Sequence, residues 1–161
     1  MLVHNQFGVI NRVTSMFRRR RFNIDNLTVS ETESADYSRI TVQFAGDEVT
    51  KQQLVHQLYK LPDVCSVAEL DPQETVSREL LLIKVRNNPE DRGDIRSASD
   101  AYKGEIVDYT KDAMVIQMVG EGRKIDNFIQ LMQDFEIMEI SRTGIIALQR
   151  GEETIRRGPN L

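Results

Sequence analysis

Apolar residues recur in the same order twice along this chain. At a shift of 74 residues, segment 39–47 aligns with segment 113–121, and each ends in a glycine followed by an acid. Apolar side chains occupy every second position, which is typical of a β-strand with one buried face. The matched positions are Ile40, Val42 and Phe44 in the first copy and Met114, Ile116 and Met118 in the second. The chain therefore contains a diverged internal duplication.

Each copy continues with a helix and a further strand. Apolar residues at helical spacing follow both segments, and another apolar run follows at 64–70 and at 137–140. The helical positions are Leu54, Leu58 and Leu61 in the first copy and Phe128, Met132 and Phe135 in the second.

Each copy also opens with strand, helix and strand. In the first copy, strand 2–5 leads into an amphipathic helix, and strand 22–32 follows. In the second copy, strand 79–85 precedes a weaker helix with Gly104 as its C-cap, and then strand 105–109. The apolar positions of the first helix are Val9, Val13, Met16 and Phe17. The order β-α-β-β-α-β predicts an α+β protein of two ferredoxin-like domains, each an antiparallel sheet with both helices on one face.

We place the domain boundaries from prolines and from loss of periodicity. Domains are expected at 1–71 and 78–150, and the stretch that begins at Asp71-Pro72 makes 72–77 the linker. Residues 151–161 show no apolar period and are expected to form a disordered tail.

Composition narrows the class of protein. A chain of 161 residues with 40% hydrophobic and 29% charged residues is long enough for two small globular domains. The net charge of −4 is evenly divided, with 8 basic and 10 acidic residues in 1–76 and 13 and 15 in 77–161. Neither half is a polycation, so nucleic acid is not the expected partner. Cys65 has no disulfide partner and no apolar run approaches the about 18 residues of a membrane span, so we expect a cytoplasmic protein without membrane contact.

The turn around Gly8 is the main candidate for binding. A strand, a glycine turn and a helix N-terminus together present free backbone N–H groups, which suit a small carboxylate. The alternative is an ordinary strand-to-helix turn with a glycine for backbone freedom. Asn5 and Asn23 favour the binding site. Within one chain they lie on opposite sides of the helix and are not expected to converge, but they could converge between two copies in a dimer.

Arg18, Arg19, Arg20 and Arg21 form the strongest charge feature. Cations at a helix C-terminus interact favourably with the helix dipole, and that role alone is one interpretation. Four consecutive arginines exceed what capping needs, so the other interpretation is contact with an acidic partner surface. RNA binding is disfavoured because the strands lack the paired aromatic residues of an RNA-recognition sheet.

The sequence gives no positive case for catalysis or for a metal site. His4 and His56 have no second ligand nearby in sequence, and Cys65 lacks a Cys-x-x-Cys motif. No Ser-His-Asp arrangement, carboxylate pair or Walker A loop is found.

These motifs resemble the small, regulatory subunits of acetohydroxyacid synthase (acetolactate synthase), whose N-terminal half is an ACT domain, a ligand-sensing module. The resemblance covers the chain to about Gly151. The residues that carry it are Asn5, Gly8-Val9-Ile10-Asn11-Arg12-Val13, Arg19-Arg20-Arg21-Phe22-Asn23-Ile24-Asp25-Asn26-Leu27-Thr28-Val29, 78–85, 124–129, Glu139-Ile140-Ser141-Arg142-Thr143-Gly144 and 147–151. The sequence departs from the family at Arg21, where a glycine is usual and a left-handed conformation is expected, at a cost of about 1 kcal/mol.

The resemblance implies a non-catalytic subunit of branched-chain amino acid biosynthesis with no cofactor of its own. It implies a homodimer through the ACT domains and binding to a separate catalytic subunit that carries thiamine diphosphate, magnesium and FAD. It further implies activation of that subunit and feedback inhibition by L-valine. The valine site is expected at Asn5, Gly8, Val9, Ile10, Asn23 and Ile24. The alternatives are a free-standing ACT sensor acting on another enzyme or a repressor, an RNA-binding protein, and an acylphosphatase-type enzyme.

Overall fold

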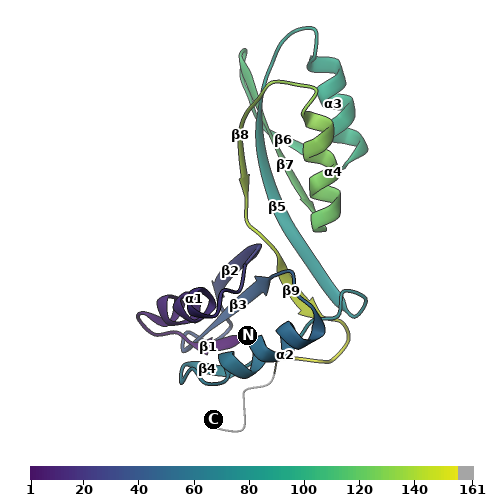
Figure 1. The fold of residues 1–161 in the computed structure, drawn as a ribbon. Coiled ribbons are helices and arrows are strands. Elements are labelled where there is room, and N and C mark those ends of the chain that lie inside the picture. The colour runs from purple at the N-terminus through teal and green to yellow at the C-terminus, as the bar shows by residue number, and fades with distance from the viewer. Residues whose placement is uncertain (156–161) are drawn as a thin grey trace. The chain divides into compact units, whose positions relative to one another are not determined.

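The chain folds into two compact units, described here from a computed structural model of residues 1–155. Residues 1–76 and the described residues from 145 onward form the first unit, and residues 77–144 form the second. Each unit is an antiparallel sheet with two helices on one face (Figure 1). The predicted α+β, ferredoxin-like fold is therefore confirmed in both halves.

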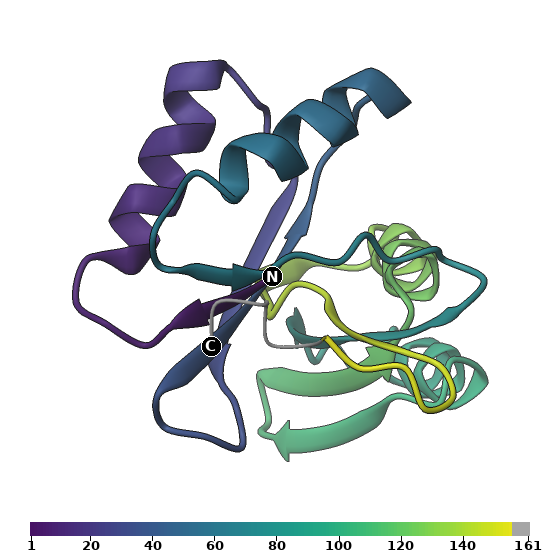
Figure 2. The same ribbon diagram turned by 90° about the horizontal axis from the view of Figure 1, so that it is seen from below.

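The first unit contains a four-stranded sheet in the order β2-β3-β1-β4. Its elements are β1 (Leu2–His4), α1 (Val9–Arg20), β2 (Asn26–Glu31), β3 (Tyr37–Gln43), α2 (Glu48–Leu58) and β4 (Val64–Ser66). Both helices lie on the same side of this sheet (Figure 2). All four apolar residues predicted for α1 are buried, and they pack with Val3, Ile40, Leu54, Leu58 and Val64 in one core.

The second unit repeats this arrangement in the order β6-β7-β5-β8. Its elements are β5 (Thr75–Arg86), α3 (Arg92–Ala101), β6 (Glu105–Tyr109), β7 (Ala113–Gly120), α4 (Gly122–Met132) and β8 (Ile137–Arg142). The predicted core residues Met114, Ile116, Met118, Phe128 and Met132 are all at most 1% exposed. The helices of the second unit pack on this face of the sheet.

Two predicted boundaries differ from the structure. Strand β5 begins at Thr75, inside the segment expected to be the linker, because Thr75 is already a buried, inward-facing strand position. Strand β4 ends at Ser66, although the apolar run was expected to stay extended to Leu70. The expected tail lies mostly outside the described residues.

A strand that the sequence analysis did not expect closes the first unit. Strand β9 (Ile146–Gln149) pairs with β5, and Ala147 within it is buried. Arg39 donates a hydrogen bond from Nη1 to the Ala147 carbonyl at 3.0 Å. Arg39 alternates with the core residue Ile40, so this bond forms on the face of the sheet opposite the helices. The backbone N–H of Ile145 donates to Oδ1 of Asn26 at 3.3 Å.

Left-handed residues end the first helix of each unit. Arg21 has a φ of 58°, as expected where the family usually has glycine, and Lys103 has a φ of 57°. The prediction that Gly104 is the C-cap of this helix is wrong, because Tyr102 is the C-cap and Lys103 takes the left-handed conformation. Gly104 is needed for space instead, since a Cβ there would lie 3.2 Å from Ile116 and 3.4 Å from the Ser99 carbonyl.

Candidate functional site

The loop between β1 and α1 presents unsatisfied backbone donors. Gly8 has a φ of 83°, which favours glycine, and it precedes α1 without a side-chain capping bond. Within residues 1–155 the N–H groups of Gly8 and Ile10 have no hydrogen-bond acceptor, whereas the Val9 N–H donates to the Gln6 carbonyl at 3.3 Å. Two of the three predicted donors are thus available to an anion at this helix N-terminus.

A cavity of about 250 Å³ lies beside this loop. It is lined by the end of β1, the start of α1, the end of β2 and the adjoining part of β3. Three of the predicted site residues, Asn5, Val9 and Ile10, line it, and Val29 and Glu31 of β2 complete its wall. The cavity is smaller than the roughly 300–1,000 Å³ that drug-sized ligands occupy, so its size suits a ligand of a few heavy atoms.

The remaining predicted residues lie elsewhere in the first unit. Gly8 is in the adjoining loop but does not line the cavity. Asn23 and Ile24 precede β2, whereas the cavity is at the other end of that strand. Asn5 and Asn23 are therefore apart within one chain, and the order of the elements had predicted this separation.

The side chain of Asn5 has one fixed end and one open end. Its Nδ2 donates to the Ala35 carbonyl at 3.0 Å, and its backbone N–H donates to the Asp36 carbonyl at 2.7 Å. These bonds fasten the end of β1 to the β2–β3 hairpin. No donor reaches Oδ1 of Asn5 within residues 1–155, so this oxygen is available at the rim of the cavity.

Asn87 occupies the equivalent position in the second unit, which sequence reasoning missed. Its backbone N–H donates to the Asp112 carbonyl at 3.0 Å and its Nδ2 to the Thr110 carbonyl at 2.6 Å. In this copy, however, Arg92 donates from Nε to Oδ1 of Asn87 at 2.8 Å. The oxygen that is open in the first unit is therefore taken by an arginine of the chain itself in the second.

An ion pair that sequence reasoning also missed lies behind the loop. Arg12, in the first turn of α1, contacts the Asp63 carboxylate with Nε at 2.5 Å and Nη2 at 3.0 Å. The Asp63 side chain is 11% exposed and that of Arg12 is 44% exposed. The two residues are 51 positions apart, so no local pattern in the sequence could reveal the pair.

The arginine cluster lies at the exposed C-terminus of α1. Arg20 donates to Oε1 of Gln57 at 3.1 Å, and the Arg21 N–H donates to the Arg18 carbonyl at 3.1 Å. Neither Arg18 nor Arg19 has an ion-pair partner within residues 1–155. Capping explains Arg21, and the side chains of Arg18 and Arg19 remain available to a partner.

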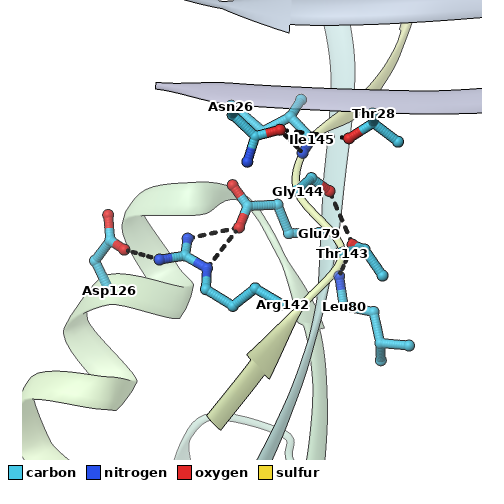
Figure 3. Close-up of polar contacts among 9 residues, drawn as sticks. All are labelled: Asn26, Thr28, Glu79, Leu80, Asp126, Arg142, Thr143, Gly144 and Ile145. Carbon is cyan, nitrogen blue, oxygen red and sulfur yellow. Dashed lines mark hydrogen bonds and ion pairs between the residues drawn. The ribbon is translucent and has the colours of Figure 1, made fainter. Parts of the chain in front are cut away.

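Arg142 joins three elements of the second unit. It donates from Nε and Nη2 to Oε2 of Glu79 on β5, at 3.0 and 2.5 Å, and from Nη1 to Oδ1 of Asp126 on α4, at 2.8 Å (Figure 3). The next residue, Thr143, exchanges two hydrogen bonds of 3.1 Å with the backbone of Leu80. The segment 139–144, singled out in the sequence, thus fixes β8 to its neighbours.

Other candidate groups have structural surroundings. The His4 ring stacks on Tyr37 at 5.4 Å between centroids, and burial raises the pKa of the Cys65 thiol. Among residues 1–155, no group of three or more His, Cys, Asp or Glu side chains is placed to hold a metal ion. No helix in the same range is long and apolar enough to cross a membrane.

Comparison with known protein families defines the class of protein. Residues 1–66 match the protein family described as "AHAS small subunit-like ACT domain", so this unit is an ACT domain. Residues 78–151 match the protein family described as "Small subunit of acetolactate synthase". The chain belongs to the family of acetolactate synthase small subunits, as its sequence motifs indicated.

Similar proteins agree over nearly the full length. The acetolactate synthase small subunit of Haemophilus influenzae is 39% identical over 156 residues, which are 96% of each chain. That of Bacillus subtilis is 40% identical over 154 residues, covering 95% of this chain and 90% of the relative. The crystal structure of the acetolactate synthase small subunit from Thermotoga maritima matches with a TM-score of 0.88 at 39% identity, over 95% of this chain and 96% of that one.

Proposed function

We propose that this small subunit binds a separate acetolactate synthase catalytic subunit, raises its activity and makes it sensitive to feedback inhibition by L-valine. The observation that carries the proposal is the loop cavity of the first unit. Open N–H groups at Gly8 and Ile10 suit the carboxylate of the amino acid, and the open Oδ1 of Asn5 suits its ammonium group. Apolar Val9 and Val29 offer a surface to the isopropyl group.

The edge of the first sheet supports a site shared by two copies. Within the described sheet, β2 pairs only with β3, so its other edge is free to pair with another strand. Antiparallel pairing of two β2 edges would place the start of one strand beside the end of the other. Asn23 and Ile24 of a second copy would then approach the cavity at Val29–Glu31. Valine at such a site would favour one arrangement of the dimer, which is a route to inhibition.

The catalytic subunit of this assembly would hold thiamine diphosphate, magnesium and FAD, and this chain would supply regulation only. Arg18 and Arg19 are proposed as contacts to it. A free-standing ACT sensor is less well supported, because the family match extends through residues 78–151.

Calorimetric titration of L-valine into the purified chain, with its oligomeric state followed in parallel, tests the sensing step. Saturable binding by a dimer, near one or one-half valine per chain, supports the shared site. Absence of binding by a folded dimer would refute the sensing role. Gly8→Asp should abolish binding, because it adds charge and bulk where the carboxylate is expected.

A further inference from the structure

Asp63 contacts both ends of the β1–α1 loop. Its backbone carbonyl accepts a hydrogen bond of 2.9 Å from the N–H of His4, the last residue of β1. Its carboxylate holds Arg12, in the first turn of α1, through two bonds of 2.5 and 3.0 Å. The loop residues Asn5–Gly8 lie between these two attachment points. A single residue, 8% exposed, therefore closes the loop at its base.

Arg12 also approaches the loop itself. A Cβ at Gly8 would lie 3.1 Å from Nη1 of Arg12, and the Phe7 carbonyl lies 3.5 Å from Nη2. The guanidinium group thus lies against the turn whose N–H groups are open. A bidentate arginine–carboxylate pair fixes geometry as well as charge, so it suits the role of holding a turn in one conformation.

The second unit supplies an internal comparison. Glu136, just before β8, accepts a hydrogen bond of 2.9 Å from the Arg86 N–H, as Asp63 does from His4. Its carboxylate, however, binds Nε and Nη2 of the same Arg86, at 3.3 and 3.0 Å, and makes no bond to α3. The carboxylate at this position therefore binds the start of the first helix in the first unit, as Asp63 binds Arg12, but not in the second unit.

We propose that Arg12 and Asp63 are the positioning pair of the effector site, holding the Asn5–Gly8 loop in the conformation that receives the carboxylate of the amino acid. This inference rests on the proposed valine site and names residues outside it. Arg12 also neutralises Asp63, which would otherwise place a bare carboxylate behind a site for an anion. Loss of Arg12 is therefore more harmful to binding than loss of the Asp63 charge.

The test compares valine affinity by calorimetry in the full chain. Asp63→Asn keeps the backbone bond to His4, loosens the loop and raises Kd roughly tenfold if the competent loop falls to about a tenth of the population. Arg12→Met raises the Kd for valine further. The double variant Arg12→Met/Asp63→Asn binds valine more tightly than Arg12→Met alone. Arg12→Lys binds valine more tightly than Arg12→Met, because it keeps a positive charge. Glu136→Gln, the matched change in the second unit, leaves Kd unchanged. Unaltered affinity in Asp63→Asn, or equal losses in Asp63→Asn and Glu136→Gln, would overturn the assignment.

Hydrogen exchange separates this inference from the proposed function. If the wild-type chain does not bind valine, the proposed function fails, yet the positioning role still predicts faster amide exchange at residues 5–8 in Asp63→Asn than in the wild type or in Glu136→Gln. Unchanged exchange there would refute the positioning pair by itself. If the wild type binds and Asp63→Asn binds equally well, only the positioning pair fails.

Discussion

Replacing Arg142 by methionine removes the cation that joins β5, β8 and α4 while keeping an apolar stem of similar length. Glu79 would keep its carboxylate in a position where the side chain is 4% exposed. Breaking a fully buried pair costs about 3–5 kcal/mol. The Arg142 side chain is 33% exposed, so water compensates in part, and we expect a loss of about 2–3 kcal/mol in the free energy of unfolding.

The matched control is Arg86→Met in the same sheet. Arg86 and Glu136 are also an arginine–glutamate pair, at 3.0 Å, but their side chains are 38% and 58% exposed. Exposed pairs contribute at most about 1 kcal/mol. The comparison therefore tests mainly the burial of the glutamate, because the second carboxylate that Arg142 contacts, that of Asp126, is exposed.

Urea unfolding of the full-length variants, followed by circular dichroism, measures both losses. Adding Glu79→Gln to Arg142→Met should restore part of the stability, because a neutral amide is less costly to bury than an unpaired carboxylate. The reasoning is refuted if Arg142→Met is no less stable than Arg86→Met. It is equally refuted if the added Glu79→Gln lowers stability further.

Three further predictions concern single positions. Arg21→Gly should raise the free energy of unfolding by about 0.5–1 kcal/mol in urea titrations, because it relieves a left-handed residue at some cost in chain entropy; no gain would contradict this. Asp47 accepts a hydrogen bond from the Thr50 N–H at 2.8 Å, and bonds from the Thr50 side chain and backbone lower the pKa of Asp47 below its ordinary 3.8. The stabilising effect of the Asp47 carboxylate is therefore present above pH 3.8 and is lost as the pH falls through the lower pKa of the folded state. The difference in free energy of unfolding between wild type and Asp47→Ala should shrink in that pH range, and a constant difference would count against the cap. Burial raises the pKa of Cys65, so iodoacetamide should alkylate the folded chain more slowly than the urea-unfolded chain, and equal rates would exclude this effect.

The repeated apolar pattern predicted the strands and helices of both repeats and the centre of each core. Period-2 positions such as Ile40 and Met114, and helical positions such as Leu54 and Phe128, are all buried as expected. Burial of one face imposes these periods on the sequence, so they can be read directly. Strand β9 escaped prediction because its four residues are too few to establish a period, and only the tertiary fold shows where they pack.

The candidate site was predictable only in part. Asn5, Val9 and Ile10 all lie in the short segment 5–10, so their closeness in sequence was enough to place them at the same cavity. Val29 lines the cavity and Asp63 binds Arg12 through contacts between residues far apart in sequence, which a single sequence does not record. The open oxygen of Asn5 became informative only beside Asn87, which makes the same kinds of backbone bond but accepts a hydrogen bond from Arg92 at its oxygen.

The attachment of β9 to the first unit has a consequence for biosynthesis. Residues 1–76 leave the ribosome first, but their unit is complete only when residues 145–149 follow. At about 5–20 residues per second, the nascent first unit waits about 4–15 s for its last strand, while residues 77–144 of the second unit are synthesised. Arg39 has no access to the Ala147 carbonyl until then. A chain terminated anywhere before residue 145 therefore loses part of its amino-terminal unit, and the domain that is synthesised first is finished last.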